Sequence, residues 1–420
     1  MPGPLPTMPP QDPELWTDFL ALCGFGGRLT GSPGEVAARD WAAQRLGAIA
    51  GGRVRREATP YLGWRCNESH LRLADGTSLE ATPLLCSGGT PDSGLMLEVV
   101  DCGRGTPEDI RAAGDSLRGR AVLVRHEYMF ATETVHRRIK LNAAIEAGAA
   151  AFLIAAPTDG MGAVSGSGVT ADGLRPIPAL GISAEAAARI AAASDARIDV
   201  RVATEFLPEA TTETLVLDLP GLGPERVVLS AHIDGHAPGE SALDNATGVA
   251  AALALARAAA PYVAELPRGL TLCLFCAEEW ALTGSKVWLA NLPEATRRDL
   301  TFNLNLDTIV GGSRLTALTS GFTELNEFVR SAAAEVGEEL GVHLPLMANS
   351  DHANFAARGI PALRLVSGFN ERDSRIRLLL TRHDRHDMVL PEEFAMPMRV
   401  AWAILVAALT SSAGSFTGGR

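Results

Sequence analysis

The chain has 420 residues, of which 47% are hydrophobic and 20% charged, so a wholly disordered protein is excluded and two or three domains are expected. Asp and Glu number 49 against 37 Lys and Arg, which leaves a net charge of −12. This balance argues against nucleic acid or an anionic membrane as the main partner, because both attract basic surfaces, and it suits a protein that holds cations.

The opening residues, MPGPLPTMPPQDPELW, lack a basic region followed by an apolar core, so we expect no signal peptide. No run of about 18 apolar residues free of charge occurs, so we expect no transmembrane helix. Six cysteines in a chain of this length do not make a disulfide scaffold. These features favour a cytoplasmic location.

The predicted elements fall into three segments along the chain. Residues 13–49 show apolar residues at helical spacing on both sides of a turn cluster, which predicts two helices. Residues 63–205 alternate short β-like runs with helical runs, which predicts a self-contained β/α unit. From residue 211 a second alternation begins, with the strand-like runs VVLSAHID, GLTLCLFCAEE, LTFNLNLD and PALRLV separated by helical runs.

Strands separated by helices imply a mostly parallel central sheet with helices on both faces. We therefore predict an α/β fold whose catalytic domain is built from residues 1–62 and 206–420 and is interrupted by the β/α unit of residues 63–205. In such sheets, ligands bind outside the carboxyl ends of the strands.

Potential metal ligands stand at three predicted strand ends. Each alone has a plain structural explanation, since an Asp before a helix is a favoured cap and a pair of Glu is usually a solvated helix start. Their joint occurrence favours a metal site, because a lone buried carboxylate is costly and a divalent cation removes that penalty. The set comprises His232 and Asp234, then Glu278 and Glu279, then Asp307, with Asp244 just before the helix that follows the first strand.

His232 and Asp234 stand two residues apart in the first strand, so their side chains point to the same side. Asp234 can then accept the second ring N–H of His232, which is the usual support of a metal-bound imidazole.

The motifs that hold these residues resemble the co-catalytic dizinc aminopeptidases, a family that also includes glutamate carboxypeptidase II-like enzymes and, as a non-catalytic relative, the transferrin receptor. The motifs are AHIDGH, SALDNATGVAA, CAEEWALTGS, NLNLD and SDHANFAARGIPAL. RLTGSPGEVAARDWAAQRL is similar to the family's opening helix segment. Residues 63–205 are similar to the inserted protease-associated domain of many members, through VDCGRGTPEDI, GRAVLVRHE and AAIEAGAAAFLI. The resemblance covers almost the whole chain.

The resemblance implies a metal-binding role for four residues. His232 and Asp307 would bind one zinc ion, Glu279 would bind a second, and Asp244 would bridge the two.

It also implies that Glu278 acts as the general base on the water that the metals activate, and we assign Asp234 to catalysis beside it. In this family the peptide after the bridging Asp is often cis, so we predict a cis peptide at Asp244–Asn245.

One part of the family's pattern is missing near the C-terminus. The family has Tyr-His-Thr there, with the His as fifth metal ligand, and an ungapped alignment puts Leu379 and Leu380 in place of Tyr and His. Leucine cannot bind zinc, so either His383 supplies the ligand from a reshaped loop, with His386 the less favoured choice, or the second metal site is weakened. His236 also stands near the site, and we interpret it as a polar loop residue.

We therefore predict a zinc-dependent exopeptidase with two zinc ions per chain, an aminopeptidase that hydrolyses the N-terminal bond of a peptide substrate. Two alternatives stay open. One is a relative that kept the fold, lost turnover and acts as a binding or structural module. The other is a carboxypeptidase-type amide hydrolase, ranked lower because the sequence shows no clear Arg cluster for a second carboxylate. The inserted unit is expected to shape the cleft or to mediate assembly, which keeps a homo-oligomer open.

Overall fold

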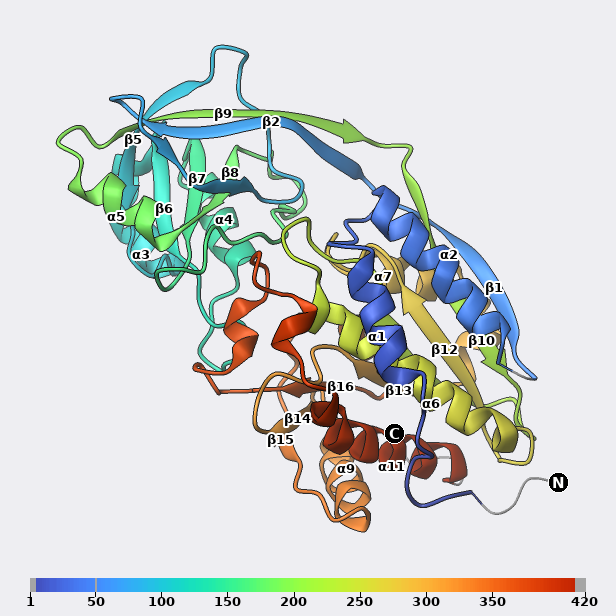
Figure 1. Ribbon diagram of the computed structural model, residues 1–420. Coiled ribbons are helices and arrows are strands. Elements are labelled where there is room, and N and C mark those ends of the chain that lie inside the picture. Colours follow the sequence, from blue (N-terminus) through green and yellow to red (C-terminus); the bar gives the residue numbers. More distant parts are fainter. Residues whose placement is uncertain (1–4, 50, 412–420) are drawn as a thin grey trace.

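The computed structural model describes residues 5–49 and 51–411, and this part of the chain forms two eight-stranded sheets with helices around them (Figure 1). Residues 1–4, which belong to the stretch considered for a signal peptide, lie outside the described residues. The α/β class is confirmed.

The main sheet has four parallel inner strands, β12, β11, β13 and β16, flanked by antiparallel partners. All residues of β12 are buried, as expected for a strand covered on both faces. In spatial order the strands are β1 (Arg53–Pro60), β10 (Thr211–Leu219), β12 (Gly269–Phe275), β11 (Arg226–His232), β13 (Leu300–Leu306), β16 (Ala362–Ser367), β14 (Leu315–Leu318) and β15 (Gly341–His343).

Helices cover both faces of this sheet. One core gathers α1, α2, α6, α9 and α11 against side chains such as Leu215 and Leu217, and the other gathers α7 and α10 against Val216, whose side chain points the opposite way. The helices are α1 (Leu15–Gly24), α2 (Pro33–Gly47), α6 (Thr247–Val263), α7 (Thr283–Asn291), α8 (Glu294–Arg298), α9 (Thr323–Glu335), α10 (His352–Ala356) and α11 (Ala395–Thr410).

The second sheet belongs to the inserted unit, which lies at one end of the main domain (Figure 1). Its long strands β2 and β9 pair with each other. β2 follows directly on β1 of the main sheet, and β9 leads directly into β10. The elements are β2 (Gly63–Leu73), β3 (Ser78–Leu79), β4 (Ala81–Pro83), β5 (Leu95–Asp101), α3 (Pro107–Ala113), β6 (Ala121–Arg125), α4 (Arg137–Glu146), β7 (Ala151–Ala155), β8 (Ala179–Ile182), α5 (Ala184–Ala192) and β9 (Arg197–Leu207). The domain boundaries after residues 62 and 205 stay a prediction.

The sequence pattern did not predict the edge strands of the main sheet. β1 reads RVRREATP and is mostly exposed or half-buried, so its charges hide the alternation that marks a strand. Its partner β10 shields the parallel strands from solvent at that edge.

Two described helical stretches, Ala242–Val263 and Pro391–Thr410, are long and apolar enough to cross a membrane by length and composition. In the structure, 72% and 61% of their most apolar windows are buried inside the protein, as in core helices. The expectation that no helix spans a membrane stays a prediction.

Candidate active site

The fold brings the predicted ligands to one edge of the main sheet. β11 lies between β12 and β13 and runs parallel to both, so the carboxyl ends of the three strands meet. His232 is the last residue of β11, Glu278 and Glu279 follow β12, and Asp307 follows β13. These four side chains are 1–7% exposed.

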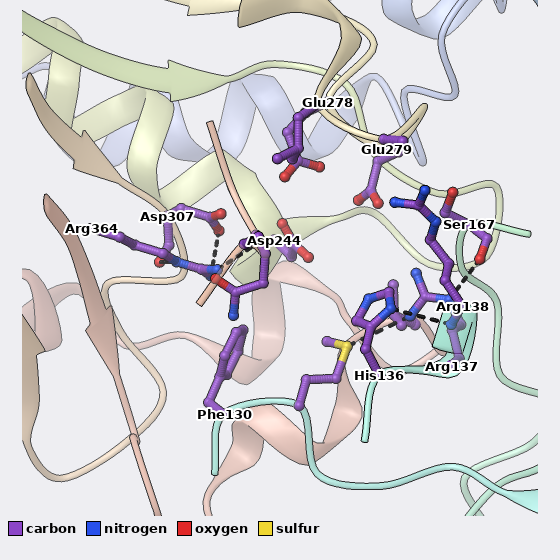
Figure 2. Close-up of a pocket in the computed structure, with 16 residues that line it drawn as sticks. Phe130, His136, Arg137, Arg138, Ser167, Asp244, Glu278, Glu279, Asp307 and Arg364 are labelled. Atoms are coloured by element: carbon purple, nitrogen blue, oxygen red, sulfur yellow. Dashed lines mark hydrogen bonds and ion pairs between the residues drawn. The ribbon is translucent and has the colours of Figure 1, made fainter. Parts of the chain in front are cut away.

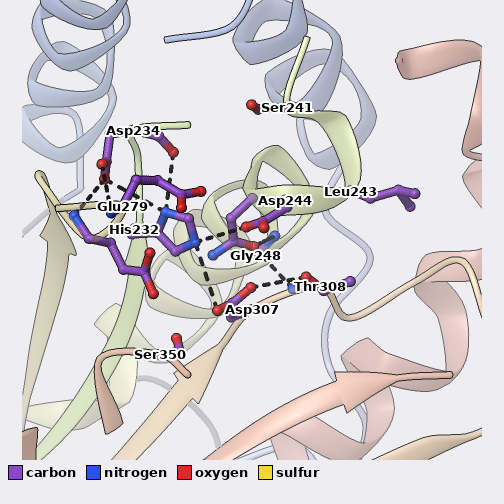
Figure 3. A network of polar contacts seen from close by, with 12 residues as sticks. His232, Asp234, Ser241, Leu243, Asp244, Gly248, Glu279, Asp307, Thr308 and Ser350 are labelled. Atoms are coloured by element: carbon purple, nitrogen blue, oxygen red, sulfur yellow. Dashed lines mark hydrogen bonds and ion pairs between the residues drawn. The ribbon is translucent and has the colours of Figure 1, made fainter. Parts of the chain in front are cut away.

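Their donor atoms converge with that of Asp244 (Figure 3). His232 Nε2 lies 3.0 Å from Asp244 Oδ1 and 3.8 Å from Asp307 Oδ2. Two triplets have donor atoms that all lie within 4.8 Å of one another: His232, Asp244 and Glu279, and His232, Glu278 and Asp307.

The loop before α6 holds Asp244 in place. The predicted cis peptide at Asp244–Asn245 is confirmed. The Asn245 amide donates to Leu306 O at 2.9 Å and its oxygen accepts from Thr308 N at 3.3 Å, which ties the loop to the end of β13. Asp384 accepts from the backbone N–H of Asp244 at 3.3 Å.

Asp234 supports the site differently from the sequence expectation. Its carboxylate lies 3.7 Å from His232 Nδ1, which is too long for a hydrogen bond, and that nitrogen is nearer the backbone O of Asp234 at 3.2 Å. The carboxylate instead accepts from the backbone N–H groups of Glu278 and Glu279, both at 3.2 Å, and from Thr30 Oγ1 at 3.0 Å. Asp234 thus fixes the turn that carries both glutamates.

Burial and like charge set the electrostatics. Burial raises the pKa of Glu278 well above its usual range, and the neighbouring carboxylate of Glu279 adds to that shift although His232 opposes it. For Asp307, burial would raise the pKa, but the Arg364 guanidinium, with Nη2 3.0 Å from Oδ1, leads the charges and hydrogen bonds that lower it.

The site fits a cation. Two buried carboxylate oxygens, Asp244 Oδ1 and Glu279 Oε1, and the ring nitrogen His236 Nε2 have no hydrogen-bond partner among the described residues. Buried polar atoms without partners point to a missing ion, and imidazole with carboxylates is a donor set that zinc binds.

His383 does not join the cluster, and the expectation that it supplies a ligand is corrected. Its Nε2 lies 3.0 Å from Gly160 O of the inserted unit, and it is in neither of the two groups of converging donor atoms. His386, the other choice, pairs with Glu240 at 2.7 Å. Leu380 lines the pocket beside the carboxylates.

Sequence reasoning placed His236 near the site as a polar loop residue and did not predict its contact with Glu279. Its ring is 2% exposed, and its Nε2 lies 2.6 Å from Glu279 Oε2. The sequence feature that could have indicated this contact is the position of His236, four residues after His232 in the loop that leads back to Asp244.

It also missed three basic residues of the inserted unit, His136, Arg137 and Arg138, which line the same pocket at the start of α4 (Figure 2). Arginines in the first turn of a helix are unfavourable beside the positive end of the helix dipole. Two of them at the start of a predicted helix could therefore have indicated a functional role. Their proximity to Glu278, Glu279 and Asp307, which lie far later in the sequence at the strand ends, was not visible without the fold.

Comparison with known proteins agrees with this geometry. Residues 214–396 match peptidase family M28 and residues 95–190 match the PA domain. Leupeptin-inactivating enzyme 1 of Streptomyces exfoliatus is 30% identical over 160 residues, 38% of this chain and 36% of that protein. Probable leucine aminopeptidase 2 of Aspergillus fumigatus is 26% identical over 309 residues, 70% of this chain and 59% of that protein. The matches therefore span less than two thirds of either curated relative.

Among solved structures, BSAP, a zinc aminopeptidase from Bacillus subtilis, aligns with a TM-score of 0.78 over 99% of this chain and 98% of that chain, at 19% identity. Because the alignment covers nearly all of both chains, the two proteins share the fold of both sheets. The matches to peptidase family M28 over residues 214–396 and to the PA domain over residues 95–190 agree with the resemblance drawn from the motifs.

Proposed function

We propose that this protein is a zinc-dependent exopeptidase, an aminopeptidase that removes N-terminal residues from peptides. The observation that carries the proposal is the convergence of one imidazole and four carboxylates at adjacent strand ends of an M28 domain, with partnerless buried oxygens among them. The names of the two relatives, a probable leucine aminopeptidase and a leupeptin-inactivating enzyme, support peptide amide hydrolysis.

Two zinc ions fit the arrangement. His232 and Asp307 would hold one ion and Glu279 the other, with Asp244 between them. When bound, zinc supplies Lewis acidity, which makes water a stronger acid and the peptide carbonyl a better electrophile.

Glu278 performs the proton transfer. Its raised pKa makes its ionised form a better base than an exposed Glu, so it accepts a proton from the attacking water and delivers it to the leaving amine. Asp234 fixes the backbone of Glu278 through the bond of 3.2 Å. The same acidic cluster attracts the free ammonium group of the substrate.

The test is the Glu278→Gln protein, assayed on amino-acid anilides. We expect kcat to fall by about 10²- to 10⁴-fold, since that is the usual contribution of a general base, while the zinc content measured by mass spectrometry stays at the wild-type level. The exposed Glu335→Gln variant is the matched control and keeps full activity. Wild-type turnover in Glu278→Gln would refute the assigned role. A wild-type protein that binds zinc but hydrolyses no peptide or anilide would favour the binding-module alternative.

A second candidate, hydrolysis of substrates that carry a carboxylate near the scissile bond, is favoured by Arg137 and Arg138. Arg137 is 7% exposed and contacts Ser167 O at 3.1 Å and Met129 Sδ at 3.8 Å. Arg138 donates to Val169 O at 2.9 Å. Neither forms an ion pair with a carboxylate in the described part of the chain.

Figure 2 shows both guanidinium groups on the Glu279 side of the pocket. Burial lowers the pKa of Arg137 to about 10, so its side chain stays charged at neutral pH. Buried charges are normally paired, and a substrate carboxylate is the partner that a guanidinium binds best. The Arg cluster that the sequence did not reveal thus supports the carboxypeptidase-type alternative, or an aminopeptidase acting on very short or acidic peptides.

A further inference from the structure

His236 lies against Glu279, the residue that the family resemblance assigns to the second zinc ion. Its Nε2 lies 2.6 Å from Glu279 Oε2, but the geometry of this contact is not that of a hydrogen bond. Three buried atoms of His236 and its neighbours have no hydrogen-bond partner among the described residues: His236 Nε2, Glu279 Oε1 and Asp244 Oδ1. One nitrogen and two carboxylate donors make a zinc-binding set.

The other ring nitrogen of His236 explains why a cation suits the contact. Nδ1 lies 3.2 Å from Ser165 Oγ. When Nδ1 carries the proton and donates it to Ser165, Nε2 presents a lone pair, the form in which imidazole binds metal. In that form, Nε2 and Glu279 Oε2, which are 2.6 Å apart, can both bind one cation.

No other imidazole of the described residues competes for this position. Only His232 and His236 have a ring nitrogen within 4 Å of a site carboxylate there, and His232 faces Asp244 and Asp307. His383 bonds to Gly160 O, away from the cluster.

Ser165 belongs to the inserted domain, so this contact crosses between domains. The backbone N–H of Ser165 also donates to Leu380 O at 2.7 Å. The same short segment thus orients the His236 ring and holds the loop that carries leucine where the family pattern has His.

We propose that His236 is the imidazole ligand of the second zinc ion, and that Ser165 of the inserted domain is a positioning residue that fixes its ring. This inference rests on the proposed function, since it assumes that the cluster binds zinc. It removes the need for a C-terminal His, and it makes the inserted domain part of the metal site.

The first experiment measures zinc bound per full-length chain after equilibrium dialysis against buffered zinc. We expect two ions in the wild type, one in His236→Ala and two in His383→Ala, with circular dichroism showing that all three are folded. With cobalt in place of zinc, His236→Ala loses part of the visible absorption of the metal-loaded wild type. Two ions bound at wild-type affinity in His236→Ala, or one ion in the wild type, would overturn the inference alone. No ion in the wild type would overturn the proposed function with it.

The second experiment tests Ser165. We expect Ser165→Ala to weaken the second zinc affinity by about 10- to 100-fold, the usual effect of removing a group that orients a metal ligand, and Ser165→Thr to restore it by keeping the hydroxyl. Ser87→Ala is the matched control, because Ser87 is an equally buried serine of the inserted domain whose hydroxyl has no partner. Unchanged affinity in Ser165→Ala overturns the positioning role even if His236 proves to be a ligand.

Discussion

The acids at the ends of β5 and β6 of the inserted domain are paired with cationic side chains, whereas in the main domain only Asp307, paired with Arg364, has such a partner among the strand-end acids of the described residues. In the inserted domain, Asp101 ends β5 and pairs with Arg125 at 2.6 Å, and Glu127 follows β6 and pairs with Lys140 at 2.5 Å. In the main domain, Glu278 and Glu279 follow β12 and are buried side by side, and neither forms an ion pair with an Arg or Lys of the described residues.

The comparison teaches that a parallel sheet does not by itself make a metal site. Both sheets place acids at the carboxyl ends of parallel strands, but in the inserted domain a cationic side chain accompanies each of the two acids compared above. In the main domain, the buried oxygens Asp244 Oδ1 and Glu279 Oε1 have no hydrogen-bond partner among the described residues, and a bound cation would compensate their charge. Three predictions test the contrast, from the largest effect to the smallest.

Metal removal should affect the main domain alone. Chelation of zinc should reduce peptidase activity by at least about 10³-fold, because Lewis acidity contributes several kcal/mol to such reactions, and added zinc should restore it. The candidate metal clusters of the described residues lie in the main domain, so hydrogen exchange at β6 and β7 should not change. Faster exchange throughout the inserted domain of the chelated protein would contradict the contrast.

Breaking the buried pair of the inserted domain should reduce stability. The Lys140 side chain is fully buried, and its Nζ donates to Arg104 O, Arg125 O and Glu127 Oε1. Lys140→Met leaves Glu127 with a weaker set of partners, so we expect the free energy of unfolding in urea to fall by about 3 kcal/mol.

The chain offers a matched control for that variant. Lys286 is the only other lysine, and it is exposed, so Lys286→Met should stay within about 0.5 kcal/mol of the wild type. Equal stability of the two variants would show that Lys140 does not compensate the buried charge of Glu127.

Arg137 should contribute to substrate binding, because it is a cationic side chain of the inserted domain that lines the main-domain pocket. Arg137→Ala should raise KM about 10- to 100-fold for dipeptides with a free carboxylate, since charge-assisted bonds contribute about 1.5–3 kcal/mol, and leave KM for amino-acid anilides unchanged. The exposed Arg111→Ala variant serves as control. Equal KM values on both substrate classes would exclude a carboxylate-binding role, and cleavage of N-acylated dipeptides by the wild type would favour the carboxypeptidase-type reading.

The sequence by itself determined the chemistry of the strand ends. Runs such as VVLSAHID and LTFNLNLD predicted buried parallel strands, and because such strands end at one edge of the sheet, His232, Asp307 and their companions could be expected to meet. The motif resemblance, confirmed by the M28 and PA matches, supplied the roles that remain to be tested.

Only the tertiary structure decided which loops and which domain complete the site. The ring of His383 turns to Gly160, that of His236 turns to Glu279, and Arg137 reaches the pocket from the inserted domain. Strand ends follow from a local, periodic pattern, whereas loop direction and domain docking depend on packing between residues far apart in the chain. That packing leaves no periodic signal in the sequence, and here it selects the side chains that surround the carboxylates.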